Sequence, residues 1–440
     1  MPARENSENS GGLSSCSSIV VREMKNPGGG FRGGGEVTEI AFSADSAHLL
    51  TGAKNFAVRV WDIRSGDVEM YAPPLAGSND DGGYHAGHLS CDLLHHPSRG
   101  LLMAAGGATG GVLVWDRSCL GSGEGGDRET KVGGPRPTAD LRNNGHEYGI
   151  SVSHLAAYPD GSFFVSADST MVKFWSAEDF TCKRTIRSSF EVKILMVSAK
   201  GTFVFITGET TGGGGEGGIK INKSKNHRTP KIRRNRAVVS VWNGRKRGTI
   251  RPGYGGEIEP TRLLKGHGGE IRSLYAPDNP DVLVTSALDA MVKVWDVPTG
   301  TCTKTIWSKG GLGSPLSYAA LVNRGAWLLT SRDDGSLQVW VVDSGKCLLT
   351  LANTAAAPAA VAAAAPAEAT VTAILPSPPQ VRAARLAVSR CGRLVAFGSG
   401  KQIKVLDLDR LADRSEAAGR PGQSGAYLAQ ALRFVVSPTT

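Results

Sequence analysis

Metal-ligating side chains are most concentrated in residues 85–96. The group consists of His85, His88, Cys91, His95 and His96. Imidazole and thiolate groups are typical zinc ligands, so these residue types suggest a metal site. The segment also has the pattern of a strand, and a strand sends successive side chains to opposite faces of its sheet. We therefore expect these residues to be structural, with no bound metal and no other cofactor.

The common catalytic and nucleotide-binding motifs are missing from the sequence. It has no GxxxxGK[ST] loop, no GxSxG elbow and no HExxH helix. The glycine run at 28–35 neither follows a strand nor opens a helix, as a dinucleotide site requires. His154 alternates with Val152, which favours a place in a strand over a role as a base. We expect neither an enzyme nor a small-molecule substrate.

Positive charge gathers in residues 220–251, which contain no Asp or Glu. The window holds twelve basic residues: Lys220, Lys223, Lys225, Arg228, Lys231, Arg233, Arg234, Arg236, Arg245, Lys246, Arg247 and Arg251. Removing them from the net charge of +10 leaves −2 for the rest of the chain. Such a segment can release counterions from phosphates. No aromatic residue between 208 and 241 offers a stacking platform for bases. The sequence is compatible with three roles for this window: nuclear or nucleolar targeting, contact with RNA, or a solvated loop without a function.

The elements around these residues repeat along the chain. Six tryptophans end short β-branched runs of similar sequence: Trp61, Trp115, Trp175, Trp242, Trp295 and Trp340. A seventh run carries Leu406 in the same place, and a second strand-like run precedes several of the seven. The shortest interval is 45 residues, which matches the ~40–45 residues of a four-stranded propeller blade. The longer intervals then contain insertions.

Gly-His pairs precede three of these runs at a nearly constant distance. His88, His146 and His267 lie 27, 29 and 28 residues before the next repeat tryptophan. Asp289 lies six residues before Trp295. Together these motifs resemble the WD40 repeat family over residues 35–409. The resemblance implies an all-β fold, a single seven-bladed β-propeller, and a non-catalytic scaffold or adaptor that binds other proteins in a multi-subunit complex.

The resemblance also implies a hydrogen-bonded network inside each blade. In the fifth unit it would join His267, Thr285 or Ser286, Asp289 and Trp295. Its role would be structural, because a buried indole N–H needs an acceptor and a buried imidazole needs its tautomer fixed.

The expected organisation has three parts. Residues 1–35 form a disordered tail, residues 36–410 the propeller and residues 411–440 a second tail. Ring closure needs a strand from outside the seven units, and either 18–22 or 432–436 could supply it. Insertions are expected at 120–143 between units two and three, at 212–236 between the second and third strands of unit four, and in the Ala/Pro-rich linker 352–369.

Two finer resemblances suggest alternative partners. The run Trp61-Asp62-Ile63-Arg64 is similar to a signature of WD40 substrate receptors of cullin-4/DDB1 ubiquitin ligases, which implies adaptor docking through Asp62 and Arg64. The stretch 181–209 resembles a blade of WD40 subunits of the small-subunit processome. That likeness implies a nucleolar scaffold in ribosome biogenesis and pre-rRNA processing.

The remaining features concern the compartment. The seven cysteines are scattered without a CxxC pair or a disulfide framework, which is typical of a reducing environment. No apolar run reaches 18 residues, and the first 30 residues have no apolar signal segment. We expect an intracellular protein, nuclear or nucleolar rather than cytoplasmic, without a membrane partner.

Overall fold

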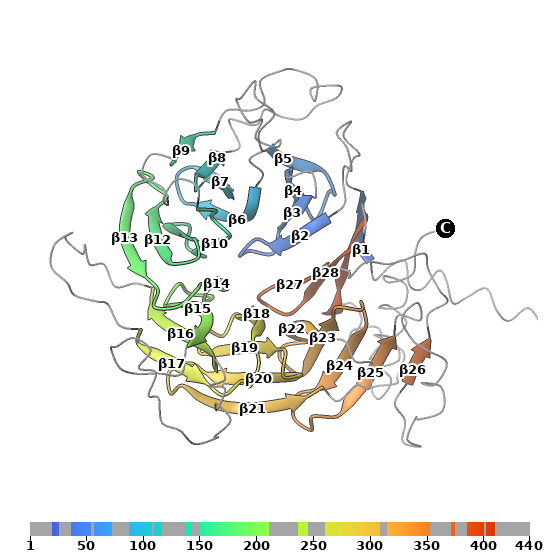
Figure 1. Cartoon of the computed structure of the whole chain (residues 1–440). Helices are drawn as coiled ribbons and strands as arrows, with labels where there is room; N and C mark the ends of the chain where they lie inside the picture. Colours follow the sequence, from blue (N-terminus) through green and yellow to red (C-terminus); the bar gives the residue numbers. More distant parts are fainter. Residues whose placement is uncertain are drawn as a thin grey trace, which may run out of the picture.

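A computed structural model gives the architecture of the chain (Figure 1). It describes residues 20–25, 37–53, 57–72, 88–107, 110–116, 137–141, 146, 150–210, 236–244, 260–308, 315–352, 371–374, 385–399 and 402–409. These residues form seven sheets around a central axis, so the expected all-β, seven-bladed propeller is confirmed. Within these ranges, helical geometry is confined to residues 408–409.

The first four blades each contain four strands. Blade one is β2 (Val37–Phe42), β3 (His48–Ala53), β4 (Val58–Asp62) and β5 (Val68–Ala72), and blade two is β6 (His88–His96), β7 (Gly100–Gly107), β8 (Val112–Asp116) and β9 (Ala139–Asp140). Blade three is β10 (His154–Ala157), β11 (Phe163–Ala167), β12 (Met171–Ser176) and β13 (Cys182–Arg187), and blade four is β14 (Ile194–Val197), β15 (Phe203–Thr210), β16 (Arg236–Asn243) and β17 (Arg262–Lys265).

The last three blades vary this plan. Blade five is β18 (Ile271–Tyr275), β19 (Val282–Ala287), β20 (Met291–Asp296) and β21 (Thr301–Trp307). Blade six is β22 (Leu316–Val322), β23 (Trp327–Arg332), β24 (Leu337–Val341) and β25 (Cys347–Ala352), with a fifth strand, β26 (Val371–Ile374), parallel to β25. Blade seven is β27 (Arg385–Val388), β28 (Leu394–Ser399), β29 (Gln402–Asp407) and β1 (Val20–Lys25).

Burial follows the position of a strand within its blade. The third strands are apolar and buried on both faces, because neighbouring blades pack against each side; four of the five residues of β4, β8 and β24 are buried. The outer strands are more open: two of the six residues of β13 and five of the seven residues of β21 are exposed. All six repeat tryptophans are at most 6% exposed, and Leu406 is fully buried in the same place.

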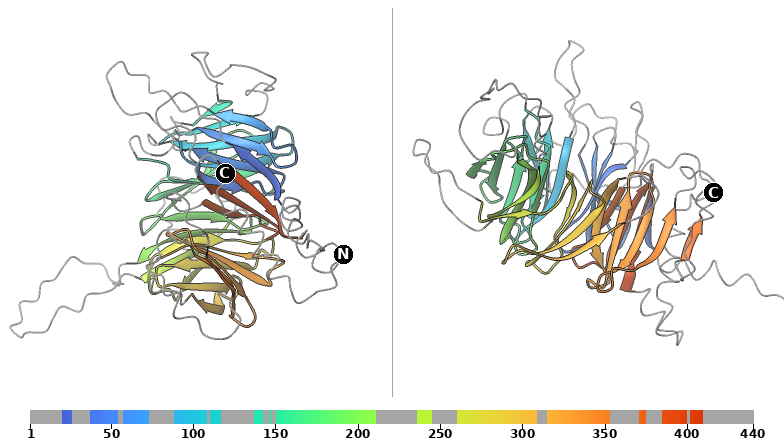
Figure 2. Two further views of the ribbon diagram at one scale, coloured as in Figure 1. Left: turned by 90° about the vertical axis from the view of Figure 1, so that its right-hand side faces the viewer. Right: turned by 60° about the horizontal axis from the view of Figure 1, so that its bottom comes forward.

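The N-terminal strand completes the ring. β1 pairs antiparallel with β29 from Val20 to Lys25, so it is the outer strand of blade seven. Blades seven and one lie side by side (Figures 1 and 2), and Met24 packs in one apolar cluster with Leu49 and Val405. The sequence offered two candidates for this closing strand, residues 18–22 and residues 432–436. β1 includes residues 20–22 of the first candidate, and the second candidate lies outside the described residues.

Strand direction gives the propeller two distinct faces. We call the face where each inner strand begins the top face; it carries the turns between second and third strands, including Asp168 and Asp289. The bottom face carries the turns between first and second and between third and fourth strands, including Asp45 and Arg64.

One insertion occupies a place that the repeat spacing did not predict, whereas the insertion of blade four falls between its second and third strands, β15 and β16, as expected. The loop expected between blades two and three belongs to blade two, because β9 pairs with β8 after residues 117–136. The basic window is not one loop, because Arg236–Asn243 forms β16 in the middle of it. Several expected segments lie outside the described residues: 212–235 of the predicted insertion, 353–369 of the Ala/Pro linker, and the tails 1–19 and 411–440.

No helix in the described part of the chain is long and apolar enough to cross a bilayer.

Candidate protein-interaction surface

Hydrogen-bonded networks fix the top turns of blades three and five. In blade five, His267 Nδ1 lies 2.9 Å from Asp289 Oδ2 and its Nε2 lies 2.7 Å from Thr285 Oγ1, which also accepts from Trp295 Nε1 at 2.9 Å. The hydroxyl of the network is therefore Thr285, while Ser286 pairs with Ser273. Both imidazole nitrogens are occupied, so this histidine holds the blade together and has no nitrogen left for a substrate.

Blade three repeats the arrangement with a serine. His146 lies 2.7 Å from both Asp168 Oδ2 and Ser166 Oγ, and Trp175 Nε1 donates to Ser166 Oγ at 2.8 Å. Burial lowers the pKa of His146. Burial opposes the ionisation of Asp168, yet hydrogen bonds from the amides of Thr170 and Met171 and from His146 bring its pKa below the usual value. The network therefore pairs a neutral histidine with an ionised carboxylate, and the role of this pair is structural.

The other tryptophans find their partners differently. Trp61 donates to Thr51 and Trp340 to Thr330, each from the position that Thr285 occupies in blade five. In blade four, Ile206 stands at that position, and Trp242 donates to Ser240 of its own strand. In blade two, Ala105 stands there and brings no hydroxyl to Trp115.

The register corrects the assignment of His88. His88 pairs with Gly107 in the first position of β6, as Ile271 pairs with Ala287 in β18. It therefore matches Ile271 and not His267, which precedes its strand by four residues. The 27-residue spacing to the next tryptophan agreed with the other blades because loop lengths between them compensate.

The histidine and cysteine cluster of residues 85–96 does not converge. Cys91 is buried and its Sγ donates to Glu39 at 3.7 Å. His96 Nε2 lies 3.0 Å from Glu178 of blade three, whereas His95 Nε2 lies 2.9 Å from Asp45 of blade one. His85 lies outside the described residues. Strand alternation thus separates His96 from His95, whereas Cys91 and His95 both face blade one from positions four residues apart along β6.

The proposed adaptor-docking residues lie on the bottom face. Asp62 ends β4, and its Oδ1 accepts from the amide of Ser65 at 2.6 Å, which shapes the turn. Arg64 is exposed in that turn. The geometry leaves Arg64 accessible to a partner without identifying one.

The basic residues are attached at two opposite ends of blade four. Seven of them, Lys220, Lys223, Lys225, Arg228, Lys231, Arg233 and Arg234, lie outside the described residues between β15 and β16, which meet at the top face. Arg236 is the first residue of β16. Arg245, Lys246, Arg247 and Arg251, also outside the described part, follow β16 at the bottom face. The two groups of charges are therefore anchored on different faces.

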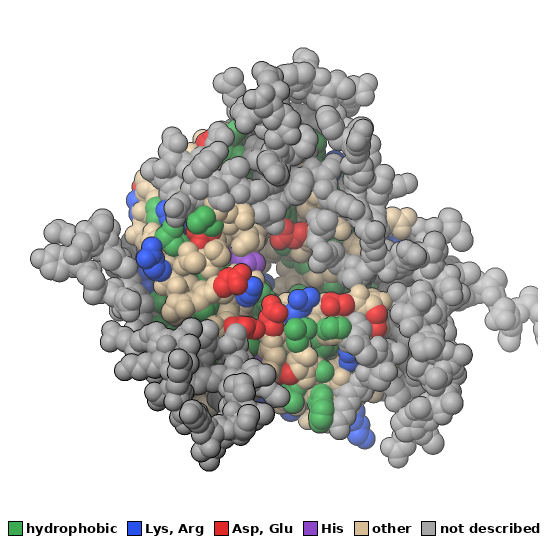
Figure 3. Space-filling model, viewed as in Figure 1, with side chains coloured by type: hydrophobic (Ala, Val, Ile, Leu, Met, Phe, Trp, Pro, Cys, Tyr) green, Lys and Arg blue, Asp and Glu red, His purple; other side chains and the backbone are tan. Residues whose placement is uncertain are grey.

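The top face of blades five and six combines exposed apolar and charged groups. Leu288 and Trp307 are 44% and 53% exposed and lie at the top ends of β19 and β21. On the same face, a cavity of about 300 Å³ is lined by Glu270, Arg272 and Asp333, among others. Leu288 adjoins it, because its amide donates to the carbonyl oxygen of Glu270, whereas Trp307 lies at the end of the outer strand β21. Arg272 and Asp333 lie 3.8 Å apart across the two blades. In Figure 3, acidic and basic side chains are mixed around the central opening. This top-face patch has the composition of a protein-binding surface.

Sequence reasoning did not select this patch. Trp307 falls outside the repeated tryptophan position, so the fold does not require an aromatic residue there. A tryptophan outside the repeated core position could have indicated this patch, since tryptophan is enriched at the energetically important positions of interfaces.

Comparisons with known proteins agree with this architecture. Residues 26–62, 138–176 and 258–296 match the family model of the WD domain, G-beta repeat. The nuclear distribution protein nudF of Aspergillus niger is 36% identical over 93 residues, 20% of each chain. The nuclear distribution protein PAC1 of Arthroderma otae is 22% identical over 218 residues, 46% of this chain and 38% of that one. The WD repeat-containing protein AAC3 of Dictyostelium discoideum is 40% identical over 50 residues. The matches thus span well under half of each relative.

Proposed function

Because the chain is a WD40-repeat protein that folds as a seven-bladed propeller, we propose that it is a non-catalytic scaffold that binds other proteins in a multi-subunit complex. The observation that carries this proposal is the top-face patch, where Leu288 and Trp307 are exposed on the face that also carries the charged residues of the cavity. A large exposed aromatic residue next to polar groups is typical of an interface hot spot.

The histidine networks support a binding role over a chemical one. Each described network closes on itself: the carboxylate, imidazole, hydroxyl and indole satisfy one another inside the blade. They hold the top turns of blades three and five in place, and a rigid surface loses less entropy when a partner binds. The named relatives are WD-repeat proteins, which fits a scaffold of this kind.

The test is affinity purification with mass spectrometry on the full-length protein. We expect Leu288→Ala combined with Trp307→Ala to lose partners that the wild type retains, at an unchanged melting temperature. The matched control is Leu263→Ala, since Leu263 is 41% exposed but lies on β17 of blade four, outside the patch. Equal partner sets for wild type, double variant and control would refute a role for this patch.

A second candidate function is substrate receptor of a cullin-4/DDB1 ubiquitin ligase. It is favoured by the exposure of Arg64 in the turn after β4 on the bottom face. This function requires that DDB1 copurifies with the protein and that Arg64→Ala weakens the association. Absence of DDB1 from the wild-type complex would exclude it.

The basic residues favour a nucleolar scaffold in pre-rRNA processing as a third candidate. Here the protein should localise to the nucleolus and copurify with pre-rRNA. Both properties should be lost when Lys231, Arg233 and Arg234 are neutralised. A cytoplasmic protein without associated RNA would contradict both this function and the proposed nuclear localisation.

A further inference from the structure

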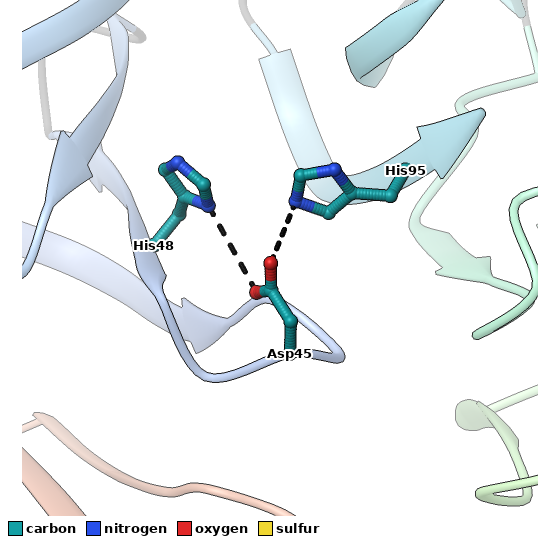
Figure 4. Close-up of side chains that lie close together, drawn as sticks. All are labelled: Asp45, His48 and His95. Atoms are coloured by element: carbon teal, nitrogen blue, oxygen red, sulfur yellow. Dashed lines mark ion pairs between the residues drawn. The ribbon is translucent and has the colours of Figure 1, made fainter. Parts of the chain in front are cut away.

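Two histidines and an aspartate converge on the bottom face where blades one and two meet. Asp45 lies in the turn between β2 and β3, His48 begins β3, and His95 is the second-last residue of β6. Figure 4 shows the two imidazole rings on either side of the Asp45 carboxylate. Asp45 and His48 belong to blade one, and His95, at least 47 positions further along the chain, belongs to blade two, so only the packing of the two blades brings the three residues together.

The separations suit a small metal ion. Asp45 Oδ2 lies 2.9 Å from His95 Nε2, and Asp45 Oδ1 lies 3.9 Å from His48 Nδ1. One ligand atom from each residue lies within 4.8 Å of the others. Tetrahedral zinc with bonds of about 2.0–2.2 Å holds its ligand atoms roughly 3.3–3.6 Å apart. The Asp45 and His95 side chains are 43% and 40% exposed, so small rotations can reach this geometry.

The nitrogens that face Asp45 lack hydrogen bonds. Within the described structure, His48 Nδ1 and His95 Nε2 are both shielded from solvent, and each faces the Asp45 carboxylate as an ion pair without the alignment of a hydrogen bond. Shielded polar atoms are normally satisfied by a protein group, a water or an ion. Two such nitrogens aimed at one carboxylate therefore point to a ligand between them.

Neighbouring groups orient the ligands as they do at known metal centres. Glu69 Oε2 lies 3.2 Å from His48 Nε2, so a proton on Nε2 faces this carboxylate and leaves the lone pair on Nδ1. Asp45 Oδ1 accepts from Ser43 Oγ at 2.5 Å and from the amide of Ala47 at 3.0 Å, which fixes the turn.

The local charge calls for a cation. Carboxylate oxygens of Asp62 and Glu69 lie with a His48 nitrogen inside a second group whose ligand atoms are within 4.8 Å of one another. With Asp45, three carboxylates therefore surround His48. Imidazoles bind a metal in their neutral form, and in that form the three carboxylates leave the group strongly negative, a charge that a divalent ion offsets. Imidazole ligands suit zinc and its neighbours in the first transition row, whereas calcium and magnesium prefer oxygen ligands alone.

We propose that Asp45, His48 and His95 form a zinc-binding site that bridges blades one and two, with Glu69 orienting His48. The ion ties the turn after β2 to the end of β6. Three protein ligands leave a fourth coordination position for water or a side chain of a bound protein.

The test uses full-length protein stripped with a chelator and titrated with Zn²⁺ by calorimetry and with Co²⁺ as an absorbing probe. We expect one site whose Co²⁺ spectrum has the intense bands of tetrahedral coordination. His48→Gln and His95→Gln should each weaken zinc binding at least 100-fold. Glu69→Gln should weaken it about 10–100-fold, as loss of an orienting carboxylate does elsewhere.

The matched control is His96→Gln. His96 is the next residue on β6 but lies 3.0 Å from Glu178 on the other side, so its loss should leave zinc affinity unchanged. Thermal melting of every variant without metal checks folding, and zinc should raise the melting temperature of the wild type and of His96→Gln but not of His95→Gln. A wild-type protein that binds no zinc, or a His95→Gln variant that binds it equally well, would overturn the proposal.

Discussion

Histidines in this propeller have different roles that depend on what surrounds each ring. His146 and His267 are held at both nitrogens inside blades three and five. His154 lies on the inner strand β10, and burial lowers its pKa to about 4, so it is neutral at physiological pH. His48 and His95 instead share a carboxylate between two blades. The residue type alone does not predict which role a histidine has, because that role depends on its contacts with residues of other strands.

Close packing between blades also depends on single residues without a side chain. Gly161 lies in the bottom turn of blade three with a φ of +69°, and a Cβ there would come 1.6 Å from the carbonyl oxygen of His95. Gly100 has a similar φ of +74° in the matching turn of blade two, but a Cβ there would meet nothing within 4 Å. The two positions share backbone strain and differ only in contact.

We predict that Gly161→Ala destabilises the protein far more than Gly100→Ala. Gly100→Ala should cost about 1–2 kcal/mol, the cost of a left-handed conformation for an L-residue. Gly161→Ala adds a backbone clash, and overpacking adds about 1–3 kcal/mol more. Denaturant unfolding of both variants measures the difference. Equal losses would mean that blades two and three do not pack as described.

At the scale of the elements, the repeat motif described the third strands well and the connections poorly. Each third strand is a β-branched run that ends at tryptophan or at Leu406, and its neighbours bury it on both sides. His88 was misassigned because spacing along the chain adds strand and loop lengths that vary independently. β26 was not predicted at all, since a four-residue strand that pairs parallel to β25 has no pattern of its own.

The closing strand gives a prediction at this scale. We expect removal of residues 1–25 to lower the melting temperature and promote aggregation, because it uncovers the edge of β29 and the apolar contacts of Met24. Removal of residues 1–17, which leaves β1 intact, is the control and should change neither property. Thermal melting and size-exclusion chromatography report both. If removing residues 430–440 had the larger effect, the second candidate segment would close the ring instead.

For the whole molecule, strand direction divides the functions between two faces. The top face carries the patch of Leu288 and Trp307, and the bottom face carries Arg64 and the cluster of Asp45, His48 and His95. β16 spans roughly 26 Å at about 3.3 Å per residue, and the two basic groups are attached at its opposite ends. A single partner does not easily engage all twelve charges.

This separation predicts that one RNA strand contacts only one of the two basic groups, and we expect it to be the group between β15 and β16. We expect neutralising Lys231, Arg233 and Arg234 to reduce the slope of log affinity against log salt for single-stranded RNA by about 2, at roughly 0.7 for each charge. Neutralising Arg245, Lys246 and Arg247 removes the same charge from the other face and should leave the slope unchanged. Binding of one RNA at several salt concentrations tests this, and equal reductions would contradict it.

The sequence by itself determined the all-β class, the seven blades and the buried tryptophans, because these depend on local strand patterns repeated along the chain. Only the tertiary structure decided which strand closes the ring, which hydroxyl joins each network, and which side chains meet between blades. Asp45 and His95 lie 50 residues apart and carry no shared motif. They meet because adjacent blades pack with their bottom turns side by side, and that contact is a property of the closed ring rather than of either segment.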